Sequence, residues 1–279
     1  TMGSIYAKIS GEMDPIPQII GDYIYPRTLE DSIPKHPLSL VLSVADRVDS
    51  LVGYFALDLF PSGSEDPIGL RRITGGLLKI LIEGGLRLNV REVLEYAWKN
   101  YNFDEEKLKD QLEKGISFIV QRLRNMLLDK YPLDVVEAVI NVGYEELWKL
   151  GKRLDFLMAF KDSKYYEKVV KALNRLYRIL PQNFVPIVVK PELQISSYER
   201  RLYDDFIKIR DEIGKEIMGA NYNVLINYEF LGNFSEDIEA FFDNVLVMSP
   251  NEEERVNRLS LLWEIKTLLW EICDWSKLS

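Results

Sequence analysis

The chain has 279 residues, of which 47% are hydrophobic and 28% charged, so it can bury a sizeable core. Its formal net charge of −9 argues against nucleic-acid binding over the whole surface, although a local basic patch remains compatible with it. Cys273 is the only cysteine, which excludes a disulfide framework or a cysteine-based zinc site within one chain. We therefore expect a cytoplasmic protein. No apolar run approaches the roughly 20 residues that cross a bilayer, so no membrane partner is expected.

Helical spacing of apolar residues dominates the chain and predicts an all-α fold made of multi-helix bundles. Helices are expected over residues 37–59, 67–83, 89–100, 104–129, 132–141, 145–160, 163–179, 195–218, 221–247 and 250–273. Phe184–Val189 is the best candidate for a short strand. Residues 181–193 contain three prolines and are the clearest candidate linker.

Residues 45–72 run from an amphipathic helix through a turn-rich loop to a pair of arginines, Arg71 and Arg72. The expected apolar stripe of that helix consists of Val41, Ala45, Val48, Val52, Phe55 and Ala56. Ser64 or Asp66 is expected to cap the next helix, with Pro67 at its first position. The two arginines then lie one turn into that helix, within reach of a phosphate or a carboxylate.

The sequence contains no complete catalytic or metal site. Its single histidine, His36, lies between prolines at a helix entrance, where a structural or exposed role is favoured over catalysis. Asp46 and Asp49 alone make a poor metal site, and solvated or salt-bridged helix residues are the favoured interpretation. No phosphate loop is present. Gly75-Gly76 is expected to allow close helix packing, and Gly84-Gly85 to end a helix.

Two regions are candidates for contact with RNA. Residues 144–180 hold nine basic and five acidic side chains, so that one face could follow a phosphate backbone, and an ordinary solvated face is an equal alternative. The second region surrounds the last helix, whose start is indicated by Ser249 as cap, Pro250 and Glu252. Phe241 and Phe242 are more often core residues than platforms for stacked bases. The candidate contacts are Arg71, Arg72, Arg175, Arg178, Phe242, Asp243, Asn244, Arg255, Asn257 and Arg258.

Several segments together resemble one family. The helix with two aspartates, the loop and the Leu-Arg-Arg of residues 45–72 are similar to a segment of the β subunit of bacterial heterotetrameric glycyl-tRNA synthetase. Met2-Gly3, Tyr6-Ala7 and Tyr25-Pro26-Arg27 match the same pattern, as do FFDNVLVM, NRLSLLWEI and CDWSKL near the other end. Glu65 and Ile68 depart from it, because lysine and phenylalanine are usual there. These matches, taken in order, make the whole chain similar to the C-terminal part of that subunit. Because the subunit is much longer, the chain is expected to be a fragment.

The resemblance implies a degenerate HD-like helical region over 1–85, a helical body over 86–190 and an anticodon-binding-like bundle over 191–279. It implies two partners, glycine tRNA and an α subunit in an α2β2 assembly, and no DNA. ATP and magnesium would act through the α subunit, with no cofactor bound by this chain. The expected role is tRNA recognition without catalysis. The alternatives are a helical scaffold that mainly docks the α subunit and a phosphohydrolase, which the single histidine nearly rules out.

Overall fold

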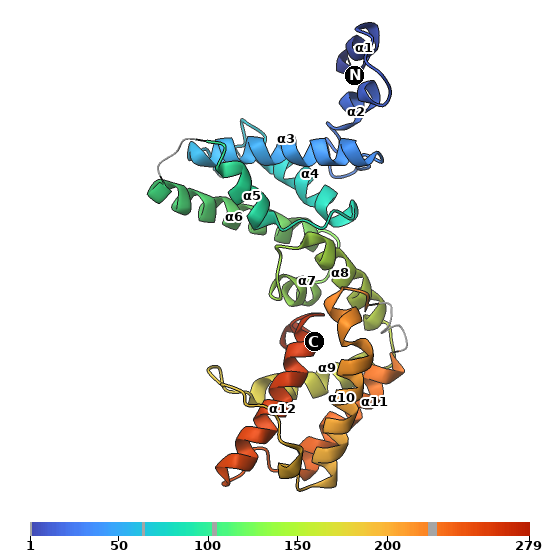
Figure 1. Cartoon of the computed structure of the whole chain (residues 1–279), viewed down its shortest axis with the longest axis vertical. Helices are drawn as coiled ribbons and strands as arrows, with labels where there is room; N and C mark the ends of the chain where they lie inside the picture. Colours follow the sequence, from blue (N-terminus) through green and yellow to red (C-terminus); the bar gives the residue numbers. More distant parts are fainter. Residues whose placement is uncertain (1, 63–64, 102–104, 223–227) are drawn as a thin grey trace. The chain divides into compact units, whose positions relative to one another are not determined.

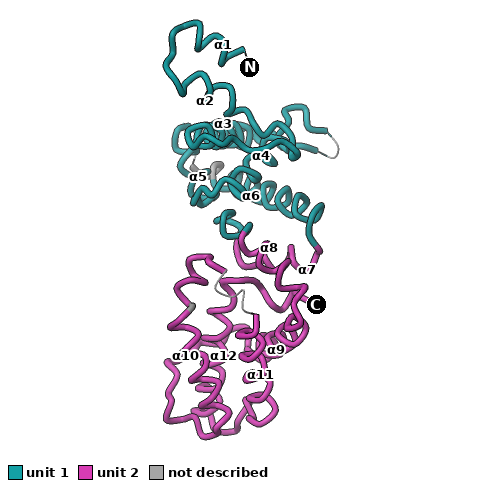
Figure 2. Tube along the Cα trace, turned by 90° about the vertical axis from the view of Figure 1, so that its right-hand side faces the viewer, with its two compact units in different colours: residues 1–131, 144–151 teal, residues 132–143, 152–279 magenta. Residues whose placement is uncertain are grey.

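The computed structural model describes residues 2–62, 65–101, 105–222 and 228–279. Within these ranges all regular structure is helical, which confirms the predicted all-α fold. The chain forms two compact units (Figures 1 and 2). Unit 1 contains residues 1–131 and 144–151, and unit 2 contains residues 132–143 and 152–279. The division into HD-like, body and anticodon-binding-like parts stays a prediction.

Unit 1 is organised around α3, which packs against α4, α5 and α6. Gly115 of α6 allows the closest approach, because a Cβ atom there would lie 2.4 Å from Cδ2 of the fully buried Phe55. The Phe55 ring also stacks on Phe60, with 5.1 Å between centroids. The helices are α1 (Met2–Ile9), α2 (Ile16–Asp22), α3 (Pro37–Ala56), α4 (Leu70–Glu83), α5 (Val90–Trp98) and α6 (Glu105–Leu128).

Unit 2 is a helical bundle in which α11 packs against both α9 and α10. Its interior is rich in aromatic rings, with Phe160 lying 5.6 Å from Tyr166 and 6.0 Å from Trp275 between centroids. The boundary between the units falls inside α8 (Leu147–Lys161). The other elements are α7 (Leu133–Ile140), α9 (Tyr166–Ile179), η1 (Pro191–Leu193), α10 (Ser197–Met218), α11 (Glu229–Asn244), α12 (Glu252–Trp270) and η3 (Trp275–Lys277).

Every helix predicted from the sequence has a counterpart in the structure. The helix predicted over 221–247 is the least accurate, because α11 begins only at Glu229 and residues 223–227 lie outside the described ranges. Two short helices, α1 and α2, pack against each other and have no counterpart among the predicted helices.

The strand predicted at Phe184–Val189 is wrong, because this segment is irregular and pairs with side chains instead of another strand. The backbone N–H of Ile187 donates to Ser260 Oγ at 3.0 Å, and that of Lys190 donates to Asn257 Oδ1 at 2.7 Å. Val188 is 85% exposed. The β-branched residues that suggested a strand therefore lie in a segment held along α12.

The predicted apolar stripe of α3 is partly wrong. Val48, Val52 and Phe55 are buried, but Val41 is 55% exposed and Ala45 is also exposed. The buried face is rotated toward Ser43 and Arg47, whose polar groups bind the backbone that precedes the helix. A pattern based on apolar residues alone cannot include two buried polar positions.

The loop that joins α3 to α4 ends at a cap made by Asp66. Its carboxylate accepts from the backbone N–H of Leu70 at 2.8 Å and of Arg71 at 3.0 Å, which confirms one of the two predicted caps. Ser64, the other one, lies outside the described residues. The helix begins at Leu70, so Pro67 does not occupy its first position.

Two glycine pairs behave as predicted. Gly76 brings α4 close to Arg47, because a Cβ atom there would lie 2.8 Å from the Arg47 Nε. Gly84 follows the last residue of α4, and Gly85 has a φ of +67° that suits glycine after a helix end.

The start of α12 differs from the prediction. Asn251, and not Ser249, caps the helix by accepting from the N–H groups of Glu253 and Glu254. Ser249 supports this cap from outside, since its Oγ accepts from the N–H of Asn251 and donates to Glu254.

Candidate nucleic-acid interface

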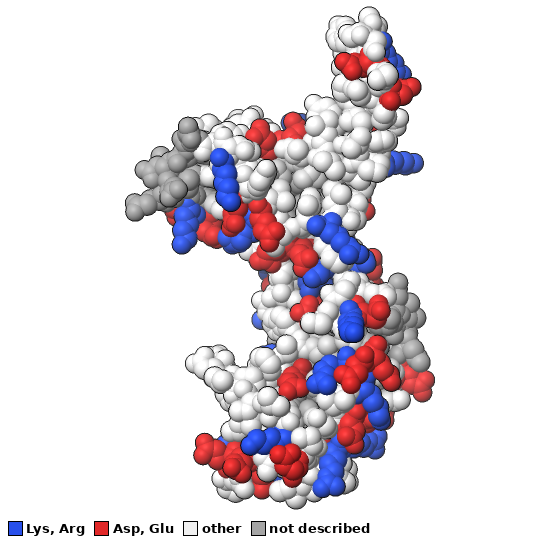
Figure 3. All heavy atoms as spheres, in the orientation of Figure 1, with Lys and Arg blue, Asp and Glu red and all other residues white. Residues whose placement is uncertain are grey.

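A basic stripe runs along α9 and the turn that precedes it. Its side chains, which we call the α9 basic stripe, recur at spacings of four and three and so share one helix face. They are Lys164, Lys168, Lys171, Arg175 and Arg178. Such a row of cations has the arrangement that follows a phosphate backbone. In Figure 3, however, basic and acidic side chains are interspersed over the face shown.

Carboxylates on α11 neutralise part of the α9 basic stripe. Lys168 Nζ lies 2.6 Å from Glu236, and Arg175 Nη1 lies 3.1 Å from Glu239 and 2.9 Å from Asp243. The Asp243 hydrogen bond raises the pKa of Arg175, and the Lys168 hydrogen bond lowers that of Glu236.

The two remaining members of the stripe's helical part are exposed. Lys171 and Arg178 lie on α9 two turns apart and face solvent. They are therefore the members of the stripe best placed to contact an RNA phosphate.

Arg175 of α9 contacts residues at the end of α11, and together they form one cluster. The Arg175 guanidinium lies 4.7 Å from the centroid of the Phe242 ring and donates to the Phe242 carbonyl. Phe242 is only 9% exposed, which fits the core alternative better than a stacking platform. Asn244 is exposed and donates to the carbonyl of Ala240 at 2.8 Å.

Two of the candidate residues on α12 are buried. Asn257 is 2% exposed, and its amide both accepts from and donates to the backbone of Lys190. The Arg258 Nε donates to Glu199 Oε1 at 2.6 Å, and its Nη1 donates to the Leu246 carbonyl at 3.0 Å. This burial argues against direct RNA contact at both positions.

Arg255 differs from its neighbours on α12. It is half-buried, and its Nη1 donates to the carbonyl of Ser249 at 2.9 Å. One face of its guanidinium group therefore anchors the segment before α12, while part of the side chain stays accessible.

In unit 1, the paired arginines and the two aspartates do not form one cluster. Asp49 accepts a hydrogen bond from the Tyr101 hydroxyl at 2.8 Å. The Arg71 guanidinium donates to the carbonyl of Glu65 at 3.4 Å. Arg72 is exposed and lines a cleft together with Asp46, and no ion pair among the described residues joins Arg72 to either aspartate.

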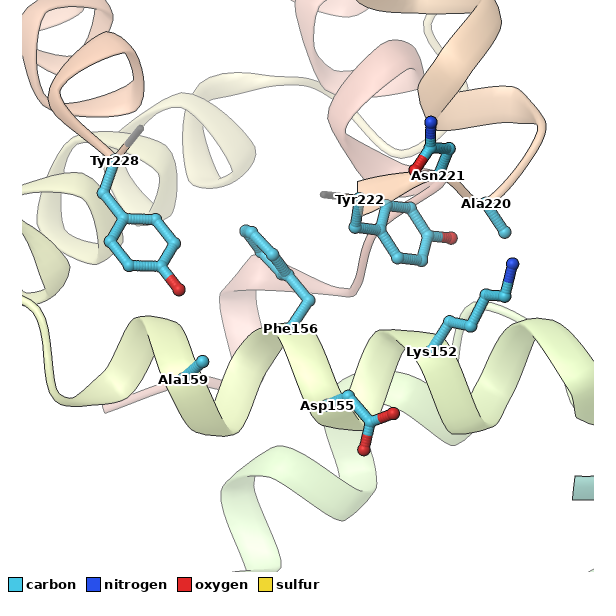
Figure 4. Close-up of a pocket in the computed structure, with 8 residues that line it drawn as sticks. All are labelled: Lys152, Asp155, Phe156, Ala159, Ala220, Asn221, Tyr222 and Tyr228. Carbon is cyan, nitrogen blue, oxygen red and sulfur yellow. The ribbon is translucent and has the colours of Figure 1, made fainter. Parts of the chain in front are cut away.

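Unit 2 also has an aromatic pocket of about 550 Å³ (Figure 4). The Phe156 ring from α8 lies among rings contributed by Tyr222 and Tyr228, while the Asp155 carboxylate points away from them. Tyr222 donates its hydroxyl to the carbonyl of Glu271, and burial raises its pKa. Phe156 is 6% exposed and Tyr222 4%, so these two rings belong to the core of unit 2.

Comparison with known proteins identifies the family. The family model described as glycyl-tRNA synthetase beta subunit matches residues 1–141, about half of the chain. The chain belongs to this family. It is 63% identical to the glycine–tRNA ligase beta subunit of Dictyoglomus turgidum and 60% identical to that of Dictyoglomus thermophilum, in each case over all of this chain. It is 32% identical to the Moorella thermoacetica protein over 99% of this chain. The chain spans about 40% of the length of these relatives.

For this family member, the structure assigns a structural task to the only histidine. His36 Nδ1 accepts from the backbone N–H of Leu38 at 3.2 Å and so caps α3, which confirms the structural role expected from the sequence. Among the described residues we find no cluster of three or more histidine, cysteine, aspartate or glutamate side chains that could hold a metal. The same residues include no helix that is long and apolar enough to span a membrane.

Two features of the interface are not predicted from the sequence. Lys171 lies within the basic region but is not among the candidate contacts, although its spacing of seven residues from Arg178 is visible in the sequence. The pairing of Arg175 with Asp243 joins residues 68 positions apart, and no local pattern predicts it.

Proposed function

We propose that this chain is the tRNA-recognition portion of a glycyl-tRNA synthetase β subunit. In this role it supports the ATP-dependent attachment of glycine to its tRNA by the α subunit. Membership of the family carries the proposal, together with similarity over the whole chain to relatives named glycine–tRNA ligase beta subunit. The matches to the family pattern near both ends favour the C-terminal part of that subunit.

The proposed mechanism is positional. The chain would hold glycine tRNA so that its acceptor end reaches the active site of the α subunit, where glycine, ATP and magnesium bind. Fixing two reactants in the right geometry lowers a barrier without any reacting group from this chain. The proposed setting is an α2β2 assembly in the cytoplasm.

The accessible cations are the proposed phosphate contacts. Lys171 and Arg178 on α9 and Arg255 on α12 have exposed or half-exposed side chains in unit 2, and Arg71 and Arg72 are their counterparts in unit 1. Asn257 and Arg258 would act indirectly, by fixing the segments that border α12. Asp243, Phe242 and Asn244 would shape the surface beside the α9 basic stripe.

The test is filter binding of glycine tRNA to the α–β assembly that carries Arg178→Ala. We expect several-fold weaker binding with an unchanged unfolding midpoint, because Arg178 is exposed. Arg210→Ala is the matched control, since Arg210 of α10 is also exposed but pairs with Asp211. Equal affinities for wild type and Arg178→Ala would remove the α9 basic stripe from the proposed interface.

Exposed apolar side chains in unit 1 favour the alternative, a scaffold that mainly docks the α subunit. Tyr6 is 60% exposed, Ile9 76% and Met13 79%, all within or just after α1. Capture of the α subunit by this chain without tRNA would support the alternative. Assays with divalent metals and nucleotide substrates are expected to show no phosphohydrolase turnover.

A further inference from the structure

Unit 1 contains a cleft of about 300 Å³ lined by three arginines, Arg27, Arg47 and Arg72, which we call the arginine cleft. Arg47 comes from α3, Arg72 from α4, and Arg27 from the segment between α2 and α3. Ile24 and Ile73 provide apolar walls, and Asp46 is the only carboxylate among the lining residues. Apolar walls of low dielectric strengthen the field of the charges that they surround.

Arg47 places a buried positive charge at this cleft. Its side chain is held by backbone carbonyls, including those of Ile24 at 3.1 Å, Pro26 at 2.9 Å and Ser43 at 3.1 Å. Burial lowers its pKa, although the neighbouring Asp46 partly offsets this effect. These hydrogen bonds occupy the N–H donors of Nη1 and Nη2. Arg47 therefore contributes positive charge to the cleft, and the hydrogen bonds to a ligand must come from other side chains.

Arg27 and Arg72 are the groups that can donate. Both are exposed, and no ion pair among the described residues involves either of them or Arg47. The Arg27 guanidinium lies 5.1 Å from the centroid of the Tyr25 ring. Arg72 lies over Gly69, where a Cβ atom would be 3.1 Å from its Nη2. The glycine, with a φ of +78°, therefore leaves room for Arg72 beside the start of α4.

We propose that the arginine cleft binds a phosphate group through Arg27 and Arg72, in the field of the buried Arg47. Arginine forms strong, often bidentate, charge-assisted hydrogen bonds with phosphate oxygens. Elsewhere in this acidic protein, arginines such as Arg91 and Arg175 have carboxylate partners. The cleft is lined by three arginines and one carboxylate, Asp46, while the Asp31 carboxylate lies outside the lining, where it accepts from the backbone N–H of Arg27. Three cations against these two carboxylates leave excess positive charge that an anion would neutralise.

The first test is calorimetric titration of the 279-residue chain with inorganic phosphate, against chloride at equal ionic strength. We expect Arg27→Gln and Arg72→Gln each to weaken phosphate binding about tenfold, the size of one lost charge-assisted hydrogen bond. Asp46→Asn is expected to tighten binding, because it removes the only negative charge in the cleft. Arg91→Gln is the control, since Arg91 belongs to the same unit but pairs with Glu113 and does not line the cleft.

Two results overturn the proposal: no phosphate binding by the wild type, or equal binding by wild type and Arg72→Gln. Protection of Arg27 and Arg72, but not Arg91, from phenylglyoxal by phosphate provides a second readout that does not depend on heat. Circular dichroism melts establish that each variant is folded.

A second arm identifies the source of the phosphate group. If a single-stranded oligoribonucleotide competes with inorganic phosphate, and Arg72→Gln weakens both, the cleft holds a phosphate of an RNA backbone. If the oligoribonucleotide does not compete, the source is a small phosphate compound. The titration with inorganic phosphate does not rest on the proposed tRNA function, so failure of either idea can be recognised separately.

Discussion

Arg47 in unit 1 and Asn257 in unit 2 each hold a backbone segment that lacks regular structure. Arg47 binds the carbonyls of Ile24 and Pro26, and Asn257 binds both polar groups of Lys190. Backbone polar groups removed from water need such partners. Both polar side chains are buried on helix faces that are otherwise mainly apolar. From the sequence alone Asn257 could be interpreted as an RNA contact, but its contacts in the structure argue against that role.

Arg258 should be essential for stability. Its partner Glu199 has a side chain only 2% exposed, so Arg258→Met would leave a buried carboxylate without its cation. Breaking a buried pair in this way typically costs about 3–5 kcal/mol of unfolding free energy. Urea unfolding followed by circular dichroism measures this loss.

The control for Arg258 is the double variant Arg258→Met/Glu199→Gln, which removes the buried charge and should recover part of the loss. Arg178→Ala, at an exposed position, should change the unfolding free energy by less than about 0.5 kcal/mol. A stable Arg258→Met chain with weakened tRNA binding would restore the direct RNA contact that its burial argues against.

Asp237 gives unit 2 a pH dependence. Burial, followed by a hydrogen bond with Asp205, raises the pKa of Asp237 to about 6 from an ordinary value of 3.8, against the opposing charge of Arg201. Because the folded state holds the proton more tightly than the unfolded state, this group stabilises the fold below pH 3.8, and the contribution is lost as pH rises through about 6. Asp237→Asn should therefore gain stability relative to wild type as pH rises from about 4 to about 7.

Unfolding free energies of wild type and Asp237→Asn across this range check the effect. Only their difference is informative, because carboxylates with lowered pKa values, such as Asp205 and Asp134, make opposite contributions. Parallel curves for the two proteins would refute a raised pKa at Asp237.

At the scale of elements, the close helix contacts depend on glycine. Gly115 lets α6 approach α3 until the space for a Cβ atom is filled by Phe55, whose ring is itself fixed between Phe60 and Phe118. Gly115→Ala should therefore destabilise unit 1 by about 1–3 kcal/mol. Urea unfolding measures the change.

Gly53→Ala is the matched control in the same unit. A Cβ atom at this α3 position would lie 3.4 Å from the Tyr101 hydroxyl, an ordinary contact, and alanine favours helix over glycine by about 1 kcal/mol. Equal effects of the two substitutions would mean that helix propensity, and not close packing, decides the outcome.

The helices were predictable because apolar periodicity, prolines and glycine pairs are local signals. Gly84 and Gly85 end α4 as expected, and Asp66 caps its start. The strand at Phe184–Val189 was wrong because β-branched composition says nothing about the partner, which is a pair of side chains on α12. The face that α3 buries also depends on distant neighbours, so its rotation toward Arg47 could not be read from spacing.

At the scale of the whole molecule, two features depend on contacts between distant residues. Residues 132–143 belong to unit 2, although the residues on either side of them, up to 131 and from 144 to 151, belong to unit 1. No change of composition marks these boundaries in the sequence. The basic region of residues 144–180 was visible in the sequence. Its partial neutralisation by α11 was not, because Glu236, Glu239 and Asp243 follow it by more than 50 positions.

This neutralisation leads to a prediction about tRNA binding. If the α9 basic stripe faces RNA, the carboxylates of α11 limit the number of phosphates that it can contact. Glu239→Gln/Asp243→Asn would release Arg175 from both ion pairs and should strengthen tRNA binding. Each added phosphate contact should also steepen the fall of log affinity with log salt concentration by about 0.7–0.9.

Filter binding of glycine tRNA to the α–β assembly between about 50 and 200 mM salt measures both quantities. Asp211→Asn/Glu264→Gln is the control, since it releases Arg210 from both of its ion pairs without touching the stripe. A steeper slope in the double variant alone places Arg175 within reach of a phosphate. An unchanged slope would leave Lys171 and Arg178 as the proposed contacts from α9. If Arg175 were near a phosphate, freeing it from its carboxylates would add a phosphate contact, and that contact would release a counterion and steepen the slope.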